Sequence, residues 1–134
     1  MFVRTRMSSP AVTIREDADF QQALQLMQER RLRRLPVLDR ADRLVGIVVE
    51  RDLLLAASRF PASHVELDDF MTHEVVTATP EMTLTEAAAT MLERRISGLP
   101  VMDQGRVVGI ITESDIFRRF VELNTDRQAP LGAA

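Results

Sequence analysis

Apolar residues between positions 84 and 91 recur at the spacing of an amphipathic helix. They stand at i, i+3, i+4 and i+7, so a helix carries all of them on one face. Thr83 precedes them and Glu86 follows it by three residues, which is the pattern of a capping box at a helix start. The apolar positions are Leu84, Ala87, Ala88 and Met91.

Short runs of β-branched and other apolar residues stand on either side of this helix. They predict strands at 75–79, 99–102 and 106–111. The Asp-Gln-Gly sequence at 103–105 predicts a turn between the last two strands. A second helix is expected from Thr112 to about Glu122, so the order of elements is β-α-β-β-α.

The first half of the chain carries the same pattern. Sliding the chain by 64 positions places the Leu-Pro-Val sequence at 35–37 on the one at 99–101, and beyond a one-residue gap the offset is 63. Asp19 and Gln22 repeat the capping pattern. The predicted fold is therefore α/β (α+β), with two β-α-β-β-α repeats packed together, because a unit of about 60 residues buries only a marginal core alone. We divide the chain into a first repeat at 1–57, a linker at 58–66, a second repeat at 67–122 and a flexible tail at 123–134.

Composition narrows the classes of function. The net charge is −3 and the chain has no Tyr or Trp, so we assign the arginines at 30–34 to a helix end and expect no nucleic acid partner. The absence of Cys excludes disulfides and thiolate metal sites. We expect no membrane span and no signal peptide, because the necessary apolar runs are missing, and a cytoplasmic protein follows as the expectation.

The sequence Gly-Ile-Ile-Thr-Glu-Ser-Asp at 109–115, with a Leu-Pro-Val block ahead of it in both repeats, resembles the CBS domain, named after cystathionine β-synthase. The resemblance covers about residues 3–122. It implies a tandem pair with a pseudo-two-fold axis, clefts between the repeats that bind AMP, ADP, ATP or S-adenosylmethionine, and assembly into a homodimer. Since we identify no output domain, it also implies a separate regulated protein.

The chemistry of a phosphate site can be read from the same motif. Where a strand ends at Thr112 and a helix begins, unpaired N–H groups and the helix dipole favour a phosphate. Gly109 permits the close approach of a backbone or a ligand. By the resemblance, Thr112 meets phosphate or ribose and Asp115 the ribose. The base is assigned to Gly98, Leu99 and Pro100, with Thr77 and Thr79 on the neighbouring strand.

A structural role for this motif competes with the ligand role. Thr112 and Asp115 also have the spacing of an ordinary capping box, which explains the helix start without any ligand. The capping interpretation does not explain the duplicated architecture around the motif. The sequence is therefore compatible with both interpretations.

The first repeat departs from the motif. Val49 replaces the Thr, and valine can neither cap a helix nor donate to a phosphate. Asp52 is retained for a ribose, while Arg33 and Arg34 stand where the second repeat has Ser97 and Gly98. An arginine there reaches a phosphate from the side or crowds the cleft. We expect two unequal sites, and the first-repeat candidates are Arg34, Leu35, Pro36 and Asp52.

The function expected is a sensor or regulatory module for an adenosine-type nucleotide, not an enzyme. The alternative is a structural or dimerisation module whose nucleotide sites are vestigial. Catalysis is disfavoured because the sequence offers no nucleophile with a base and no metal cluster. The two histidines, His64 and His73, are assigned to a linker and a turn.

Overall fold

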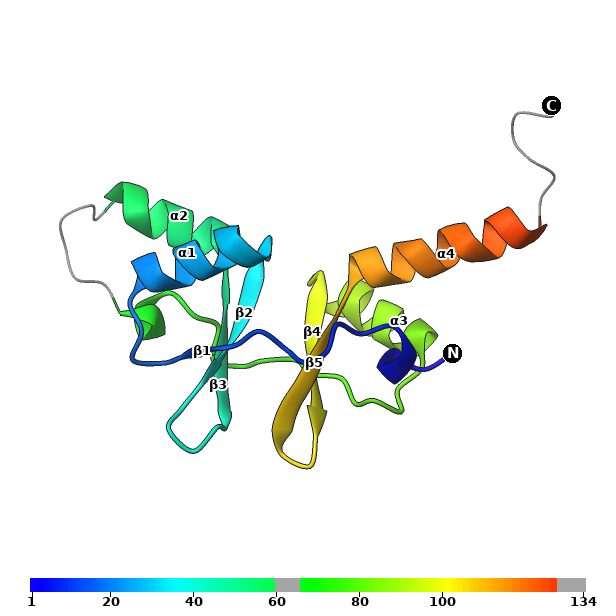
Figure 1. The fold of residues 1–134 in the computed structure, drawn as a ribbon, viewed down its shortest axis with the longest axis horizontal. Helices are drawn as coiled ribbons and strands as arrows, with labels where there is room; N and C mark the ends of the chain where they lie inside the picture. Colours follow the sequence, from blue (N-terminus) through cyan, green and yellow to red (C-terminus); the bar gives the residue numbers. More distant parts are fainter. Residues whose placement is uncertain (60–65, 128–134) are drawn as a thin grey trace.

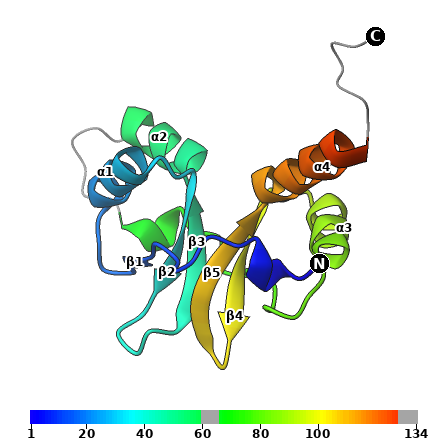
Figure 2. The ribbon, with the colours of Figure 1, turned by 45° about the vertical axis from the view of Figure 1, so that its right-hand side comes forward.

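Two small β-sheets stand next to each other, and each is accompanied by its own pair of helices. In this computed structural model, which describes residues 1–59 and 66–127, the first sheet has the strand order β1-β2-β3 and the second the order β4-β5. Figures 1 and 2 show α1 and α2 beside the first sheet and α3 and α4 beside the second. The strands are β1 (Ile14–Arg15), β2 (Arg34–Leu38), β3 (Leu44–Val49), β4 (Gly98–Asp103) and β5 (Arg106–Thr112). The helices are α1 (Phe20–Arg30), α2 (Glu50–Arg59), α3 (Leu84–Arg94) and α4 (Glu113–Arg127), with short 3-10 turns η1 (Val3–Thr5) and η2 (Leu67–Asp69).

Pairing within the two sheets follows the repeat. β2 and β3 are antiparallel, with Arg34 opposite Val49, and β4 and β5 are antiparallel, with Gly98 opposite Thr112. In the second hairpin the turn places Gln104 and Gly105 at positive φ, as two-residue hairpin turns require. These observations confirm the predicted α/β class and the duplicated layout.

Helices α1 and α3 begin at the predicted caps. The Asp19 carboxylate accepts from the Gln22 backbone N–H at 2.8 Å, and the Gln22 side chain accepts in return from the Asp19 N–H at 2.9 Å. The Thr83 hydroxyl accepts from the Glu86 N–H at 3.0 Å. Each cap satisfies an N–H group that a helix start leaves unpaired.

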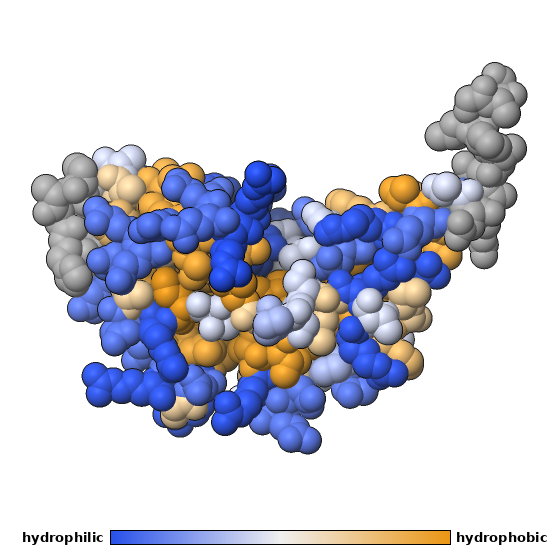
Figure 3. All heavy atoms as spheres, viewed as in Figure 1, coloured by the Kyte–Doolittle hydropathy of each residue, from blue (hydrophilic) through white to orange (hydrophobic). Residues whose placement is uncertain are grey.

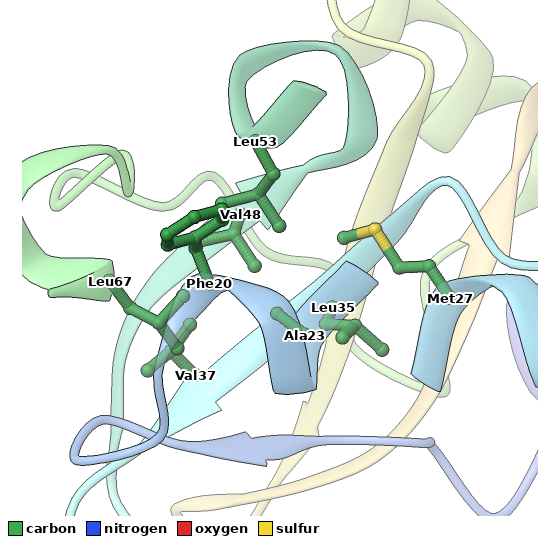
Figure 4. Close-up of a cluster of buried hydrophobic side chains, with 8 residues drawn as sticks. All are labelled: Phe20, Ala23, Met27, Leu35, Val37, Val48, Leu53 and Leu67. Atoms are coloured by element: carbon green, nitrogen blue, oxygen red, sulfur yellow. The ribbon is translucent and has the colours of Figure 1, made fainter. Parts of the chain in front are cut away.

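The leading segment of each repeat packs on the other repeat. Val3 is fully buried within the second hydrophobic cluster, and Leu67 is fully buried within the first. Figure 1 shows the chain near the N-terminus lying beside α3 and then passing to the first sheet. Figure 4 shows Leu67 directed toward Phe20 and Val37 in the core of the first repeat. The repeats of the sequence are therefore not the packing units of the fold.

Two glycines permit this crossing. A Cβ on Gly109 would lie 2.6 Å from the carbonyl oxygen of Ser8, and one on Gly46 would lie 2.6 Å from Sδ of Met71. The crossing segments are also hydrogen bonded to the strands, since the Ser8 N–H donates to Ile110 at 2.9 Å. Gly109 therefore admits a backbone segment, which is one of the two uses expected of it.

Three predicted boundaries need correction. The strand expected at 75–79 is a single parallel bridge between Ala78 and Val101, since the chain leaves β4 after this contact. Helix α2 extends to Arg59 and α4 to Arg127, so the helix continues into the predicted tail. The centre of the predicted linker, with His64, and residues 128–134 lie outside the described residues.

Candidate functional site

A cleft of about 1020 Å³ lies between the two repeats, and both contribute to its walls. The first repeat supplies the end of β3 and the start of α2, including Val49 and Glu50. The second repeat supplies parts of α3 and α4 and the start of β4, including Gly98. Figure 3 shows a hollow on the upper side of the molecule between its two halves. The cleft is thus a property of the pair and not of either repeat.

One part of the wall is apolar. Val75, Val76, Ile96 and Ile116 are half-buried residues of this wall, and Met91 lies buried behind them. Leu92 and Phe117 stand at the same cleft with 81% and 60% of their surface exposed. These side chains form a surface that suits a flat apolar group such as an aromatic base.

Charged residues line the rest of the cleft. The cations are Arg33, Arg34, Arg51 and Arg95, and the anions are Glu50, Glu74 and Glu113. Within residues 1–59 and 66–127, none of these four arginines forms an ion pair with a carboxylate. The arginines therefore remain available to an anionic ligand.

Arg34 crosses from the first repeat to the second. Its guanidinium donates a hydrogen bond to the Ser97 hydroxyl. A Cβ on Gly98 would lie 2.7 Å from Nη1 of Arg34 and 2.9 Å from Cζ. A side chain at 98 would therefore require the guanidinium to shift from this position.

The environment of Arg34 is electrostatically unfavourable. Burial lowers the pKa of the Arg34 guanidinium below its ordinary value, Glu113 acts in the opposite direction, and Arg33 lowers the pKa further. An arginine nevertheless stays protonated in a protein. Desolvation therefore acts on a cation whose one side-chain acceptor among residues 1–59 and 66–125 is a neutral hydroxyl.

The two helix starts at the cleft are held in the same way. The Glu50 N–H donates to the Arg33 carbonyl at 2.8 Å, and the Glu113 N–H donates to the Ser97 carbonyl at 3.0 Å. These paired bonds tie the start of α2 to the residue just before β2, and the start of α4 to the residue just before β4. They place Arg33 and Ser97 at equivalent positions beside the cleft.

The motif at Thr112 and Asp115 forms an internal contact. The Asp115 carboxylate is buried, with 8% of the residue exposed, and its Oδ2 accepts from the Thr112 N–H at 2.9 Å and from the Thr112 hydroxyl at 3.0 Å. Its Oδ1 accepts from Arg118 at 3.3 Å. This is the geometry of helix capping, the second interpretation of the motif.

The predicted site residues separate into two groups. Gly98, Pro100 and Arg34 line the cleft. The others do not line it, for different reasons. Leu35 and Leu99 are fully buried in the two cores, and Pro36 is buried on β2. Thr79 is exposed, and Thr77 and Asp52 are half-buried outside the cleft. Thr112 and Asp115 bond to each other.

The crossed arrangement explains this division. The prediction grouped Gly98 and Pro100 with Thr112 of the same repeat, whereas the cleft joins them to Val49 of the first repeat. The cleft therefore forms beside the repeat from which we expected the weaker site. The apolar wall of Ile96, Ile116 and Phe117 was also missed. The available signal was the pseudo-two-fold symmetry, which brings the strand start of one repeat to the helix start of the other.

Other chemistries find little support in the described part of the chain. Residues 1–59 and 66–127 hold no group of three or more His, Cys, Asp or Glu side chains placed to bind a metal ion. His73 contacts Asp68 at 2.9 Å on the surface. None of the helices in the described ranges has the length and apolar character that crossing a membrane requires.

Sequence comparison identifies the repeat. A model of the CBS domain matches residues 3–59 and again residues 67–122. An inosine-5'-monophosphate dehydrogenase from Nitrosopumilus maritimus is 39% identical over 105 residues, which make up 78% of this chain and 21% of that enzyme. The chain spans 41%, 21% and 23% of the lengths of three curated relatives.

Solved structures share the whole arrangement. The CBS domain pair of protein MJ0100, in complex with 5'-methylthioadenosine and S-adenosyl-L-methionine, has a TM-score of 0.83 and 30% identity, covering 91% of this chain and 97% of that one. CBSX2 in complex with AMP has a TM-score of 0.78 and 27% identity, covering 92% of this chain and 98% of that one. Both similar proteins carry adenosine compounds.

Proposed function

The chain belongs to the CBS domain family, and from this premise we propose that it is a regulatory module that binds an adenosine-type nucleotide in the cleft between its repeats. The family match confirms the resemblance drawn from the Gly-Ile-Ile-Thr sequence and the paired Leu-Pro-Val blocks. The observation that carries the proposal is the cleft of about 1020 Å³, with an apolar wall and four arginines that form no ion pair within the described ranges.

The composition of the cleft supports an adenosine compound. An adenine ring suits the apolar wall at Val76 and Ile116, and a ribose or phosphate suits the arginines that line the same cleft. Similar CBS pairs carry 5'-methylthioadenosine, S-adenosyl-L-methionine or AMP. We assign the cleft no catalytic step. Its output is a change in how the two repeats pack, which a ligand produces by binding one arrangement more tightly than another.

Two matched variants test the proposal. Phe117 lines the cleft with 60% of its surface exposed, whereas Phe120 on the same helix is 64% exposed and does not line it. We expect calorimetric titration with AMP, ADP, ATP and S-adenosylmethionine to detect at least one ligand. Phe117→Ala weakens that ligand by about fivefold, the size of a lost aromatic contact. Phe120→Ala leaves its affinity within about twofold.

Absence of binding by all four ligands contradicts the proposal. It would favour the alternative of a structural module, which the internal Thr112–Asp115 contact already supports at that motif. An equal loss in both Phe variants would place the ligand outside the cleft. Incubation with ATP and assay of released phosphate tests the absence of catalysis separately.

Self-association is the second part of the proposal. Phe117, Phe120 and Val121 are 60%, 64% and 59% exposed and stand at i, i+3 and i+4 of α4, so they form an apolar stripe on the solvent face. Exposed apolar stripes of this kind mark interaction surfaces. We propose that a second copy covers this stripe. Sedimentation should give a dimer that Phe120→Glu converts to a monomer, and a wild-type monomer at all concentrations would contradict it. A separate regulated protein would then read the assembled state.

A further inference from the structure

The surroundings of Arg34 indicate the charge of the ligand that the cleft binds. Arg34 is partly buried at the junction of the repeats, and within the described part of the chain its guanidinium donates to one side chain, the neutral Ser97 hydroxyl. Arg33 and Arg51 line the same cleft and are exposed. In the described ranges, none of the three forms an ion pair with a carboxylate. With Arg95, four arginines thus line the cleft, against three glutamates.

The negative groups of the cleft do not cancel this arrangement. Glu50, Glu74 and Glu113 also line it, but among residues 1–59 and 66–125 none of them lies within ion-pair distance of an arginine. Glu113 acts on Arg34 through space, and burial outweighs that effect. A buried guanidinium is stabilised most by an oxygen anion that it can bind in a bidentate manner.

We infer that the cleft selects an adenosine ligand that carries phosphate over one that carries a positive charge, and that Arg34 determines this selection. The inference rests on the proposed function, because it names the charge class of the same ligand. In this arrangement the phosphate lies at Arg34, with Arg33 and Arg51 beside it. The sulfonium of S-adenosylmethionine would add a positive charge to a cleft that four arginines already line.

Gly98 leaves the space in which the Arg34 guanidinium lies. A side chain at 98 would collide with the guanidinium, so the glycine allows Arg34 to lie across the second repeat. The Ser97 hydroxyl takes one N–H on Nη2 of Arg34, and a guanidinium carries five N–H donors, so a phosphate would bind through others of the same side chain. Binding and contact between the repeats are consequently linked through one side chain.

Calorimetric titration with four compounds tests the inference. ADP, AMP, adenosine and S-adenosylmethionine share the adenosine group and differ in charge. We expect affinity to fall in the order ADP, AMP, adenosine, with S-adenosylmethionine no tighter than adenosine. Arg34→Gln should weaken ADP by about tenfold, as for the loss of a charged hydrogen bond, and leave adenosine within about twofold. Arg40→Gln, an exposed arginine outside the cleft, is the control and should change neither.

Each outcome separates the two proposals. If S-adenosylmethionine or adenosine binds as tightly as ADP, the charge preference is wrong and the proposed function stands. The assignment to Arg34 is wrong if Arg34→Gln weakens adenosine as much as ADP, or weakens neither. If none of the four compounds binds, and ATP does not bind either, the proposed function is wrong and the inference is overturned with it. Circular dichroism and the melting temperature of each variant exclude misfolding as the cause of a lost signal.

Discussion

Arg34 and Gly98 occupy equivalent positions in the two repeats, and the guanidinium of one lies against the backbone of the other. Their contact is close enough that a Cβ at 98 would lie 2.7 Å from Nη1 of Arg34. A duplicated unit with arginine at both positions would bring two cations together at the junction. Divergence of this pair of positions therefore permits the repeats to approach.

A double-mutant cycle measures this relationship. We expect Gly98→Ala to destabilise the wild-type protein by about 1 kcal/mol, because the side chain of Arg34 must move. In the Arg34→Gly background the same change should stabilise by about 0.5 kcal/mol, since alanine costs less backbone entropy than glycine in a strand. Urea unfolding of the four proteins gives the coupling energy. Additive effects would show that the two residues do not compete for space.

The two crossing glycines should differ in their tolerance of a methyl group. At Gly109 a Cβ meets the Ser8 carbonyl oxygen at 2.6 Å, and at Gly46 it meets Sδ of Met71 at the same distance. A backbone held by hydrogen bonds yields less easily than a thioether. We expect Gly109→Ala to cost about 2 to 3 kcal/mol and Gly46→Ala about 1 kcal/mol or less in chemical unfolding. The reverse order would contradict the crossed packing of the N-terminal segment.

The local elements were predictable because their causes are local. The caps at Asp19 and Thr83 depend on residues three positions apart, and the structure confirms both. The packing of Val3 in the second core could not be predicted from the repeat. Both repeats have the same pattern, so a leading segment could pack on its own repeat or on the other one. The prediction of a strand at 75–79 was wrong for a similar reason. β propensity does not reveal how many residues of a segment pair with a neighbouring strand.

The candidate site was predicted less completely. Arg34, Gly98 and Pro100 were recognised from the motif positions, and all three line the cleft. Thr112 and Asp115 were grouped with them because they are neighbours in the same repeat. The actual wall is assembled across the pseudo-two-fold axis, a long-range relationship that spacing along the chain does not express. The Thr112 N–H bond to Asp115 is the reciprocal half of a capping box, and the ligand interpretation of the two residues stays a prediction.

The capping motif yields a graded prediction. Asp115→Ala removes the acceptor of both Thr112 bonds and should destabilise the protein by about 1 to 2 kcal/mol. Thr112→Val keeps the backbone bond, copies Val49 of the first repeat, and should cost less. Thermal unfolding orders the variants, and nucleotide titration provides the second readout. A strong loss of nucleotide affinity in Asp115→Ala, with little loss of stability, would restore the ligand interpretation of this motif.

The turn between β2 and β3 predicts a dependence of stability on pH. Asp39 accepts from the N–H groups of Ala41 at 2.8 Å and Arg43 at 3.0 Å and from Nε of Arg43 at 3.0 Å. The backbone hydrogen bond from Arg43 is the main cause that lowers the pKa of the Asp39 carboxyl below its ordinary value. Asp103 is its counterpart in the second repeat and lies in a shorter turn.

The sign of the effect follows from the lowered pKa. A carboxyl whose folded-state pKa is below its unfolded value stabilises the fold above the unfolded pKa, about 3.9, and loses that effect as the pH falls through the folded value. We therefore expect Asp39→Asn to lower the melting temperature at pH 7 and to converge with the wild type as the pH falls below about 4. Asp103→Asn serves as the matched control and should show a smaller effect at pH 7. A difference for Asp39→Asn that persists unchanged at pH 2 would mean that the ionised carboxylate does not stabilise the turn.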